Sequence, residues 1–254
     1  MILAGGSVVV TGGAVRIGKA IALSLAEQGH PIGLHFGSSA AQAEETLREI
    51  RAQGVPAVSI QADLSQPVTA AAAIFEQAGQ ALGPIRILIN SAAIFAPGTL
   101  LTTTEADWDH HLKINCKAPF FLTQQFVRQL PEGAVGCVIN LLDWRAEVPV
   151  PGHAAYTVAK AGLLAQTRFL AQELGPRVRV NAIAPGAILP APGDSSAAFQ
   201  QLARKNPLQR VGSPAEIVRA VHYLLQAEFV TGEVLHVTGG EELGRPIPGN
   251  FDSN

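Results

Sequence analysis

Charged residues are scarce in this chain of 254 residues. Lys, Arg, Asp and Glu together make up 15% of it, and the formal net charge is -2. A protein that holds a nucleic-acid backbone needs a surplus of cations, so nucleic acid is not an expected partner. Hydrophobic residues make up 48% of the chain, which is enough for one large buried core. Because no break in composition is visible, we predict a single domain over residues 1–254.

Cysteine and long apolar runs are also rare. The two cysteines, Cys116 and Cys137, lack the paired spacing of metal ligands, and we expect no metal. No apolar run reaches the roughly 18 residues of a membrane span, so no membrane partner is expected. Residues 1–10 are apolar but lack a basic leader and a cleavage site, and they read as a first strand. These absences predict a reduced, cytoplasmic setting.

Short apolar, β-branched runs recur between longer segments of helical period, an alternation typical of βαβ units around a parallel sheet. The expected strands are continuous hydrophobic runs, as strands covered on both faces require. They are Ser7–Val10, Ile32–His35, Ala57–Gln61, Ile85–Asn90, Gly136–Leu141, Val178–Ala184 and Leu235–Val237.

Helical segments fill the intervals between these strands. Apolar residues recur every three to four positions, as on the buried face of an amphipathic helix. One such face holds Ile17, Ala20, Ile21 and Leu25, another holds Ala43, Leu47 and Ile50, and further helices are expected at 118–130, 155–174 and 214–225. Residues 185–194 are rich in Pro, Gly and Ala and predict a mobile loop. The fold class is therefore α/β, a Rossmann-type doubly wound parallel sheet of seven strands flanked by helices.

A glycine-rich turn, Thr11-Gly12-Gly13-Ala14-Val15-Arg16-Ile17-Gly18, follows the first strand and opens a helix. Glycines there allow a tight turn and close approach of a pyrophosphate, which binds the free amides at the helix N-terminus. Such a turn alone is weak evidence and can be a plain strand-to-helix connection. Its position after the first strand favours a dinucleotide.

The end of the second strand has no carboxylate to hold a ribose 2′-hydroxyl. It reads His35-Phe36-Gly37-Ser38-Ser39. Arg16, His35, Ser38 and Ser39 instead offer donors for a 2′-phosphate, so NADPH/NADP+ is favoured over NADH. Alternatively, Arg16 is a solvated surface residue and the serines cap the next helix.

Asp63, followed by Leu64 after the third strand, is a candidate acceptor for the adenine amino group. It is equally well interpreted as a helix or turn cap.

Tyr156 and Lys160 lie four residues apart, so on a helix they share one face. A nearby ammonium lowers the pKa of a phenol, which predicts that Tyr156 is a usable proton donor near neutral pH. Lys160 is also placed to bind a nicotinamide ribose. In isolation, the pair fits equally a half-buried aromatic beside an exposed helix charge.

Five motifs occur in an order that resembles the short-chain dehydrogenase/reductases, over nearly the whole chain. They are the Thr11–Gly18 turn, Asn90-Ser91-Ala92-Ala93, Asn115 in Lys113-Ile114-Asn115, Tyr156 with Lys160, and Pro185-Gly186. The resemblance implies that Asn115 holds a water in a proton relay through Lys160 and that Asn90 braces the sheet beside the cofactor. The implied cofactor-binding set is Gly12, Arg16, Ile17, Gly18, His35, Phe36, Ser38, Ser39, Asp63, Leu64, Asn90, Ala92, Tyr156, Lys160, Pro185 and Gly186.

Two departures from the family pattern point to a subgroup. Arg16 stands at a usual glycine, and Asp143 stands thirteen residues before Tyr156, where the catalytic serine is usual. This pair resembles the pteridine reductases, as does Phe95, which matches the aromatic that stacks a pterin ring. Ser38, where these enzymes often have arginine, and Ala93, where a polar residue is often found, do not match.

The resemblance implies hydride transfer from NADPH to a pterin-like heterocycle, a dihydropterin or a folate-type ring. Reducing a ring C=N bond needs a proton delivered to nitrogen. Tyr156 is the expected donor, and Asp143 hydrogen-bonded to it is expected to relay a proton. The catalytic set is then Tyr156, Lys160, Asp143 and Asn115, and Phe95, Asp143 and Tyr156 face the substrate. We expect the acid and base groups to titrate as a coupled set. Asp143 as a loop cap and Phe95 as a plain loop-core aromatic are the structural alternatives.

Several further expectations follow. The segment from Ala187 to Asn206 is expected to close over the substrate, with Trp144, Arg145 and His153 as further pocket residues. The resemblance also suggests a homotetramer in which the long helices containing Asn115 and Tyr156 pair across subunits. Two alternative functions stay open: a generic carbonyl or 3-oxoacyl-thioester reductase with Asp143 in the serine role, and a non-catalytic NADPH-binding sensor.

Overall fold

The sheet organises the molecule. A computed structural model describes residue 3, residues 5–190 and residues 195–244. All seven strands are parallel and pair in the order β3-β2-β1-β4-β5-β6-β7. Their bounds are β1 Ser7–Val10, β2 Ile32–Phe36, β3 Ala57–Gln61, β4 Ile85–Asn90, β5 Gly136–Leu141, β6 Val178–Pro185 and β7 Val234–Val237. The predicted doubly wound α/β fold is confirmed.

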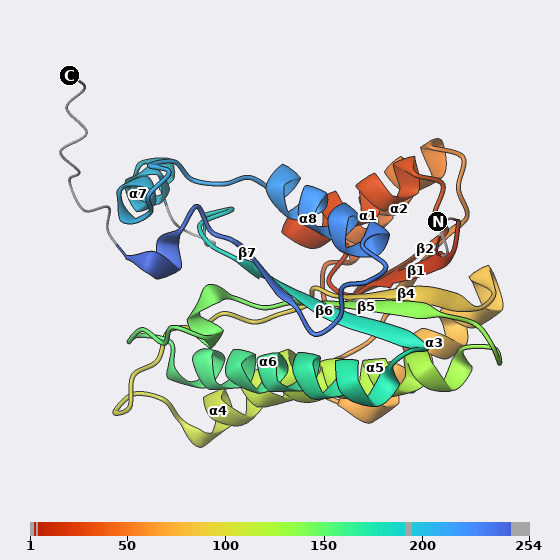
Figure 1. Cartoon of the computed structure of the whole chain (residues 1–254), viewed down its shortest axis with the longest axis horizontal. Coiled ribbons are helices and arrows are strands. Elements are labelled where there is room, and N and C mark those ends of the chain that lie inside the picture. The colour runs from red at the N-terminus through yellow and green to blue at the C-terminus, as the bar shows by residue number, and fades with distance from the viewer. Residues whose placement is uncertain (1–2, 4, 191–194, 245–254) are drawn as a thin grey trace.

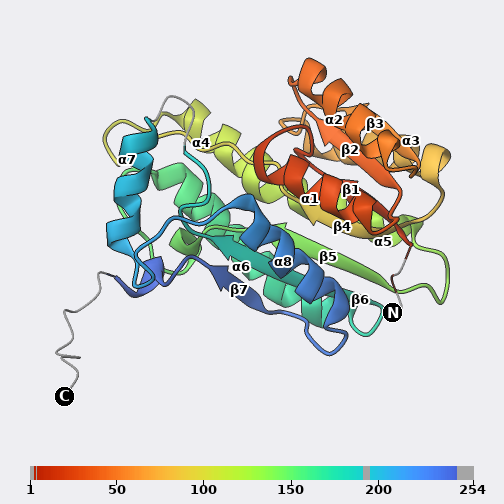
Figure 2. The ribbon, with the colours of Figure 1, turned by 90° about the horizontal axis from the view of Figure 1, so that it is seen from above.

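Helices cover both faces of this sheet (Figure 1). On one face lie α1 (Arg16–Glu27), α2 (Ala40–Ala52) and α8 (Pro214–Gln226). On the other lie α3 (Pro67–Leu82), α4 (Glu105–Leu112), α5 (Ala118–Gln129) and α6 (Ala154–Leu174). The short α7 (Ser196–Gln201) lies beyond one end of the sheet in both views (Figures 1 and 2). None of the helices within the described ranges is long and apolar enough to cross a bilayer.

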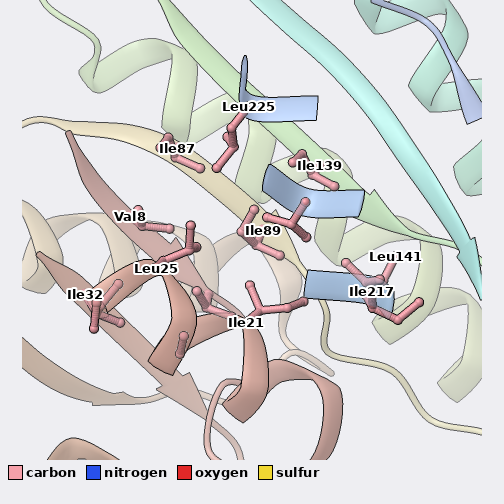
Figure 3. Packing of buried hydrophobic residues seen from close by; sticks show 14 of the residues in the cluster. Val8, Ile21, Leu25, Ile32, Ile87, Ile89, Ile139, Leu141, Ile217 and Leu225 are labelled. Carbon is pink, nitrogen blue, oxygen red and sulfur yellow. The ribbon is translucent and has the colours of Figure 1, made fainter. Parts of the chain in front are cut away.

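Branched aliphatic side chains fill the space between the sheet and the helices. Because side chains alternate across a strand, Val8 and Val10 of β1 pack under α1 while Val9 packs on the opposite side. Figure 3 shows Ile21 and Leu25 of α1 packed with the strand residues of this layer. Each fully buried side chain of this kind contributes about 1.5–3 kcal/mol to folding.

The strands and helices whose bounds were predicted lie within about one residue of the observed ones, but α3, α4 and α7 were not foreseen. Helix α3 buries Ile74 and Phe75 in an alanine-rich segment, so its apolar face is less visible in the sequence. Helix α4 starts at a capping box in which Thr104 and Asp107 exchange hydrogen bonds. Neither segment stood out by hydrophobic period alone.

The segment between Ala187 and Asn206 is not simply a loop. It contains α7, whose first turn is capped by the Ser195 hydroxyl accepting from the Ala198 amide at 3.1 Å, and a 3₁₀ turn, Leu202–Lys205. This capping bond gives the segment a helical start that the Pro and Gly content nearby obscured. Of the predicted mobile loop at 185–194, residues 191–194 lie outside the described residues.

The strand order reverses at the β1–β4 pair, which opens a crevice at the carboxyl ends of the strands. Thr11, directly after β1, ties the two sides of this point together. Its hydroxyl oxygen accepts from the amides of Ser91 at 3.0 Å and Ala92 at 3.1 Å, directly after β4. The motifs that follow β1, β2, β4, β5 and β6 therefore meet at one edge of the sheet.

Candidate active site

The glycines of the turn after β1 leave no room for side chains. A Cβ at Gly18 would lie 2.1 Å from the carbonyl oxygen of Gly12, and one at Gly12, where φ is +63°, would lie 2.9 Å from Ala92 Cα. The backbone therefore packs closely where α1 begins. Such a cradle fits a pyrophosphate group, because nothing projects between the ligand and the helix N-terminus.

Arg16 occupies a left-handed backbone position in this turn, with φ of 55°. A non-glycine residue adopts this conformation only at an energetic cost. Its side chain is exposed, and Nη2 donates to the carbonyl oxygen of Pro190 at 2.8 Å. Arg16 thus connects the cofactor turn to the segment after β6 instead of pointing freely into solvent.

His35 does not lie with the other phosphate-binding candidates, and its expected role needs correction. Its ring is 2% exposed, with Nδ1 accepting from the Gly12 amide at 3.2 Å and Nε2 lying 3.0 Å from the Ala62 carbonyl oxygen. Burial lowers the pKa of His35 below its ordinary value, which favours the neutral ring. The ring therefore braces the glycine turn, and neither nitrogen faces outward.

Ser38 and Ser39 follow the carboxyl end of β2, just before α2. Ser39 holds the N-cap position of α2, yet its hydroxyl makes no capping bond. The capping alternative therefore does not account for this side chain. Asp63, by contrast, accepts from the Ser65 amide at 2.9 Å and from the Ser65 hydroxyl at 2.6 Å. These bonds lower the pKa of Asp63, and the geometry is that of a turn cap on an exposed residue.

Helix α6 places Tyr156 and Lys160 one turn apart, facing the end of β5. Tyr156 donates from its hydroxyl to Asp143 Oδ2 at 3.1 Å. Lys160 is 2% exposed, its Nζ donates to the Leu141 carbonyl oxygen at 2.5 Å, and it lies 5.8 Å from the centre of the Tyr156 ring. The structure therefore brings these three predicted residues together.

The expected lowering of the Tyr156 pKa by Lys160 is wrong. The Tyr156 pKa is raised well above its usual range, first by burial and then by the charge and hydrogen bond of Asp143, with Arg145 acting in the opposite direction. Burial also lowers the pKa of Lys160 to about 8. The phenol is thus held in its protonated, donor form, because burial disfavours the phenolate.

Arg145 has a role that the sequence analysis did not foresee. Its Nη1 lies 3.2 Å from Oδ1 and 3.1 Å from Oδ2 of Asp143, and its backbone amide donates to Oδ1 at 2.9 Å. Asp143 therefore caps the turn after β5 and also accepts a hydrogen bond from Tyr156, and its catalytic part stays a prediction. The only sequence signal was an arginine two residues after the aspartate.

Phe95 forms an aromatic wall beside this group. Its ring stacks on His153 with centroids 4.1 Å apart and planes 11° apart, and it meets Tyr156 edge-on at 4.7 Å. The Phe95 side chain is 46% exposed, so it is not a loop-core aromatic. Burial lowers the pKa of His153, which favours the neutral ring that stacks well.

A family match covers most of the chain. The sequence model described as Enoyl-(Acyl carrier protein) reductase matches residues 13–242. A "Short-chain type dehydrogenase/reductase" of Picea abies is 32% identical over 253 residues, covering 94% of this chain and 93% of the relative. The chain belongs to the short-chain dehydrogenase/reductase family.

Other members of this family differ in the chemistry that their names describe. A 3-oxoacyl-[acyl-carrier-protein] reductase FabG of Staphylococcus aureus is 35% identical, covering 92% of this chain and 97% of the relative. The structure of FolM alternative dihydrofolate reductase 1 from Brucella suis in complex with NADP has a TM-score of 0.91 and 38% identity, and covers 98% of this chain and 99% of that one. The protein of that name from Brucella canis, also complexed with NADP, has a TM-score of 0.92 and 37% identity, with 98% coverage of both chains.

Two asparagines brace the site of this short-chain dehydrogenase/reductase. Asn115 lies in a π-helical turn, Lys113–Lys117, between α4 and α5. Its side chain accepts from the Ile94 amide and donates to the Ile94 carbonyl, both at 2.9 Å, which holds the backbone next to Phe95. Asn90 donates to Asn140 Oδ1 at 2.8 Å, an interstrand bond that the sequence analysis missed because it depends on register.

The remaining expected cofactor residues lie around the same crevice. A Cβ at Gly186 would lie 2.8 Å from Thr238 Cα, and the Gly186 amide donates to Val237 at 3.0 Å, so the chain passes close to β7 just after Pro185. Leu64 is buried behind Asp63, and Ile17 is partly buried in the first turn of α1. Their part in cofactor binding stays a prediction.

Proposed function

We propose that this chain is an NADPH-dependent reductase of a pterin-like heterocycle, a dihydropterin or a folate-type ring. The observation that carries the proposal is the hydrogen bond from Tyr156 to Asp143, at the position where the family usually has serine. A serine hydroxyl polarises a carbonyl group, whereas a carboxylate holds and orients a proton donor. The FolM neighbours from Brucella support the same substrate class.

NADPH is the proposed cofactor. The cradle made by Gly12 and Gly18 fits the pyrophosphate, and Arg16, Ser38 and Ser39 offer donors for the 2′-phosphate while no carboxylate ends β2. The NADP complexes of the Brucella proteins support this choice. When bound, NADPH supplies a hydride for the substrate carbon.

The residues of the chain supply the proton. As a C=N bond is reduced to CH–NH, Tyr156 gives its hydroxyl proton to the ring nitrogen and is left as a phenolate. The Lys160 ammonium, 5.8 Å from the ring centre, stabilises that negative charge. Phe95 is 46% exposed and stacks on His153, so it offers an aromatic contact for a conjugated ring.

A 3-oxoacyl-thioester or other carbonyl reductase is the second candidate. The identity of 35% with the Staphylococcus aureus FabG protein supports it. In that case Asp143 would take the place of serine beside a ketone. The two candidates differ in the atom that receives the proton, nitrogen or oxygen, and therefore in the effect of restoring a serine.

The experiment that separates them is NADPH consumption with quinonoid dihydropterin, dihydrobiopterin, dihydrofolate and simple ketones, for wild type, Asp143→Ser and the surface control Asp109→Ser. Asp109 is a suitable control because its side chain is 55% exposed on α4. We expect selective turnover of a pterin, lost in Asp143→Ser and kept in the control. Turnover of ketones alone, kept or improved in Asp143→Ser, would establish the carbonyl reductase. Tight NADPH binding without any turnover would establish a sensor.

We also propose that the chain forms a homotetramer through the outer faces of α5 and α6. The ring centroids of Phe120 and Phe121 on α5 lie 5.3 Å apart. The ring centroid of Phe169 on α6 lies 6.5 Å from that of Phe120. Phe169 is 42% exposed, so this aromatic cluster faces outward and supports burial by a second copy. Light scattering should give a smaller assembly for Phe169→Asp than for Phe169→Leu; equal masses would contradict this interface.

A further inference from the structure

The ion pair between Asp143 and Arg145 has a geometry that proton donation by Tyr156 does not itself require. The side chains of Asp143 and Arg145 are 13% and 24% exposed, so water screens them little. Charge-assisted bonds that involve both carboxylate oxygens are strong and fix orientation. The pair is therefore more than a surface contact.

The acceptor positions of Asp143 are filled. Oδ1 accepts from the Arg145 amide and from Nη1, while Oδ2 accepts from Nη1 and from the Tyr156 hydroxyl. A carboxylate offers about four lone-pair positions. A direct bond from Asp143 to the substrate would therefore require one of these donors to be displaced.

Building on the function proposed above, we propose that Arg145 is a positioning residue that keeps the Asp143 carboxylate directed at the Tyr156 hydroxyl. Asp143 then acts as a fixed acceptor and Tyr156 as the proton donor. In reduction of a C=N bond, the proton moves from the Tyr156 oxygen to nitrogen while the hydride forms the new C–H bond. Asp143 stays a hydrogen-bond acceptor throughout, and Arg145 acts through Asp143.

The aromatic side chains nearby hold the guanidinium in this place. Its central carbon lies 4.9 Å from the Trp144 ring and 5.9 Å from the Phe95 ring, and planar guanidinium groups stack on such rings. Arg145 Nε is buried without a hydrogen-bond partner in the part of the chain that the structure describes. The Arg145 side chain thus binds Asp143 through Nη1 and lies against the two aromatic rings.

The groups that act on this pair come from three elements. Tyr156 and Lys160 face the pair from α6, and His153 faces it from the N-cap of that helix. His111 of α4 acts electrostatically on His153. Cys116 of the π-helical turn acts electrostatically on Lys160. The charge of Asp143 raises the pKa of Tyr156, whereas the charge of Arg145 lowers it. Removing Arg145 should therefore raise the Tyr156 pKa further, and removing the charge of Asp143 should lower it.

A double-mutant cycle tests whether Arg145 acts through Asp143. The cycle compares kcat and KM of wild type, Arg145→Met, Asp143→Asn and the double variant, using whichever pterin or ketone turns over. We expect Arg145→Met to lower kcat about tenfold in the wild-type background and less than about twofold in the Asp143→Asn background, because coupled residues are non-additive. Arg145→Lys should restore part of the lost kcat, because a lysine ammonium keeps a cationic donor beside Asp143.

A second measurement needs no substrate and therefore separates this inference from the proposed function. The chain has two tyrosines, so Tyr223→Phe leaves Tyr156 as the only phenol whose ionisation appears in the ultraviolet difference spectrum. Tyr223 is 52% exposed on α8, outside the site. In this background we expect ionisation of Tyr156 at higher pH with Arg145→Met and at lower pH with Asp143→Asn.

Three results would overturn the inference. Equal losses of kcat in both backgrounds, with a raised KM, would mean that Arg145 contacts the substrate directly. A fall in melting temperature with unchanged kcat and unchanged ionisation of Tyr156 would mean a purely structural role. If Tyr156 ionised at the same pH with and without the Arg145 side chain, the coupling would be refuted. This spectroscopic test stays available if Arg145→Met is too unstable for kinetics and only Arg145→Lys can be assayed.

Discussion

The ammonium group of Lys160 lies 5.8 Å from the ring of Tyr156 and donates to the carbonyl oxygen of Leu141, the last residue of β5. Lys160 is buried on α6, and a buried ammonium is costly unless its donors are satisfied. Burial lowers its pKa to about 8. The site therefore contains a cation whose charged form is destabilised by burial, next to the tyrosine whose anion it stabilises in the proposed reaction.

This burial predicts how stability depends on pH. Because the folded-state pKa of about 8 is below the unfolded value of 10.5, the unfolded chain binds more protons between these values, and stability rises with pH there. The penalty below pH 8 is on the order of 3 kcal/mol. In denaturant unfolding, the stability advantage of Lys160→Met over wild type should therefore shrink as pH rises from 8 toward 10.

The control for this experiment is Lys113→Met, since Lys113 is 46% exposed and its charge is not buried. Its stability relative to wild type should stay nearly constant over the same range. A constant difference for Lys160→Met as well would show that the ammonium carries no burial penalty.

The burial of His35 predicts a second dependence of stability on pH, on the acid side. Its folded-state pKa lies below the ordinary 6.5, so the unfolded chain takes up a proton first as pH falls, and this contribution to stability is lost below pH 6.5. Relative to His35→Gln, which cannot titrate, wild type should lose stability between pH 7 and 5.5. A parallel pH dependence of the two proteins, measured by urea unfolding, would contradict this.

The tight turn predicts opposite outcomes for two glycine substitutions. A Cβ at Gly18 collides with the Gly12 carbonyl, whereas one at Gly79 in α3 meets nothing within 4 Å. We expect Gly18→Ala to lower the free energy of unfolding by about 3 kcal/mol or more and to abolish NADPH binding. Gly79→Ala should raise the free energy of unfolding by about 0.5–1 kcal/mol, because alanine favours the helix. Thermal unfolding and NADPH fluorescence measure both; tight binding by Gly18→Ala would contradict the proposed cradle.

Ser39 predicts a change in cofactor preference. A carboxylate there would repel a 2′-phosphate and accept from a 2′-hydroxyl. Ser39→Asp should lower the ratio of NADPH to NADH affinity by about tenfold or more, while the uncharged Ser39→Ala should change it much less. Fluorescence titration with each cofactor gives the ratio, and an unchanged ratio in Ser39→Asp would place the phosphate elsewhere.

Local patterns in the sequence determined the parallel sheet, the glycine turn after β1 and the shared face of Tyr156 and Lys160, because strand and helix periods and glycine geometry act over a few residues. The capping bonds that start α4 and α7 are equally local, but the hydrophobic period does not report them.

Tertiary structure alone decided which groups meet across the crevice. The ring of His35 faces the glycine turn instead of a phosphate, and Arg145 rather than Lys160 is the cation paired with Asp143. The Tyr156 pKa is raised rather than lowered, since burial and the Asp143 charge act most strongly on it. Burial and charge pairing depend on residues distant in the chain, so spacing along the sequence cannot determine them.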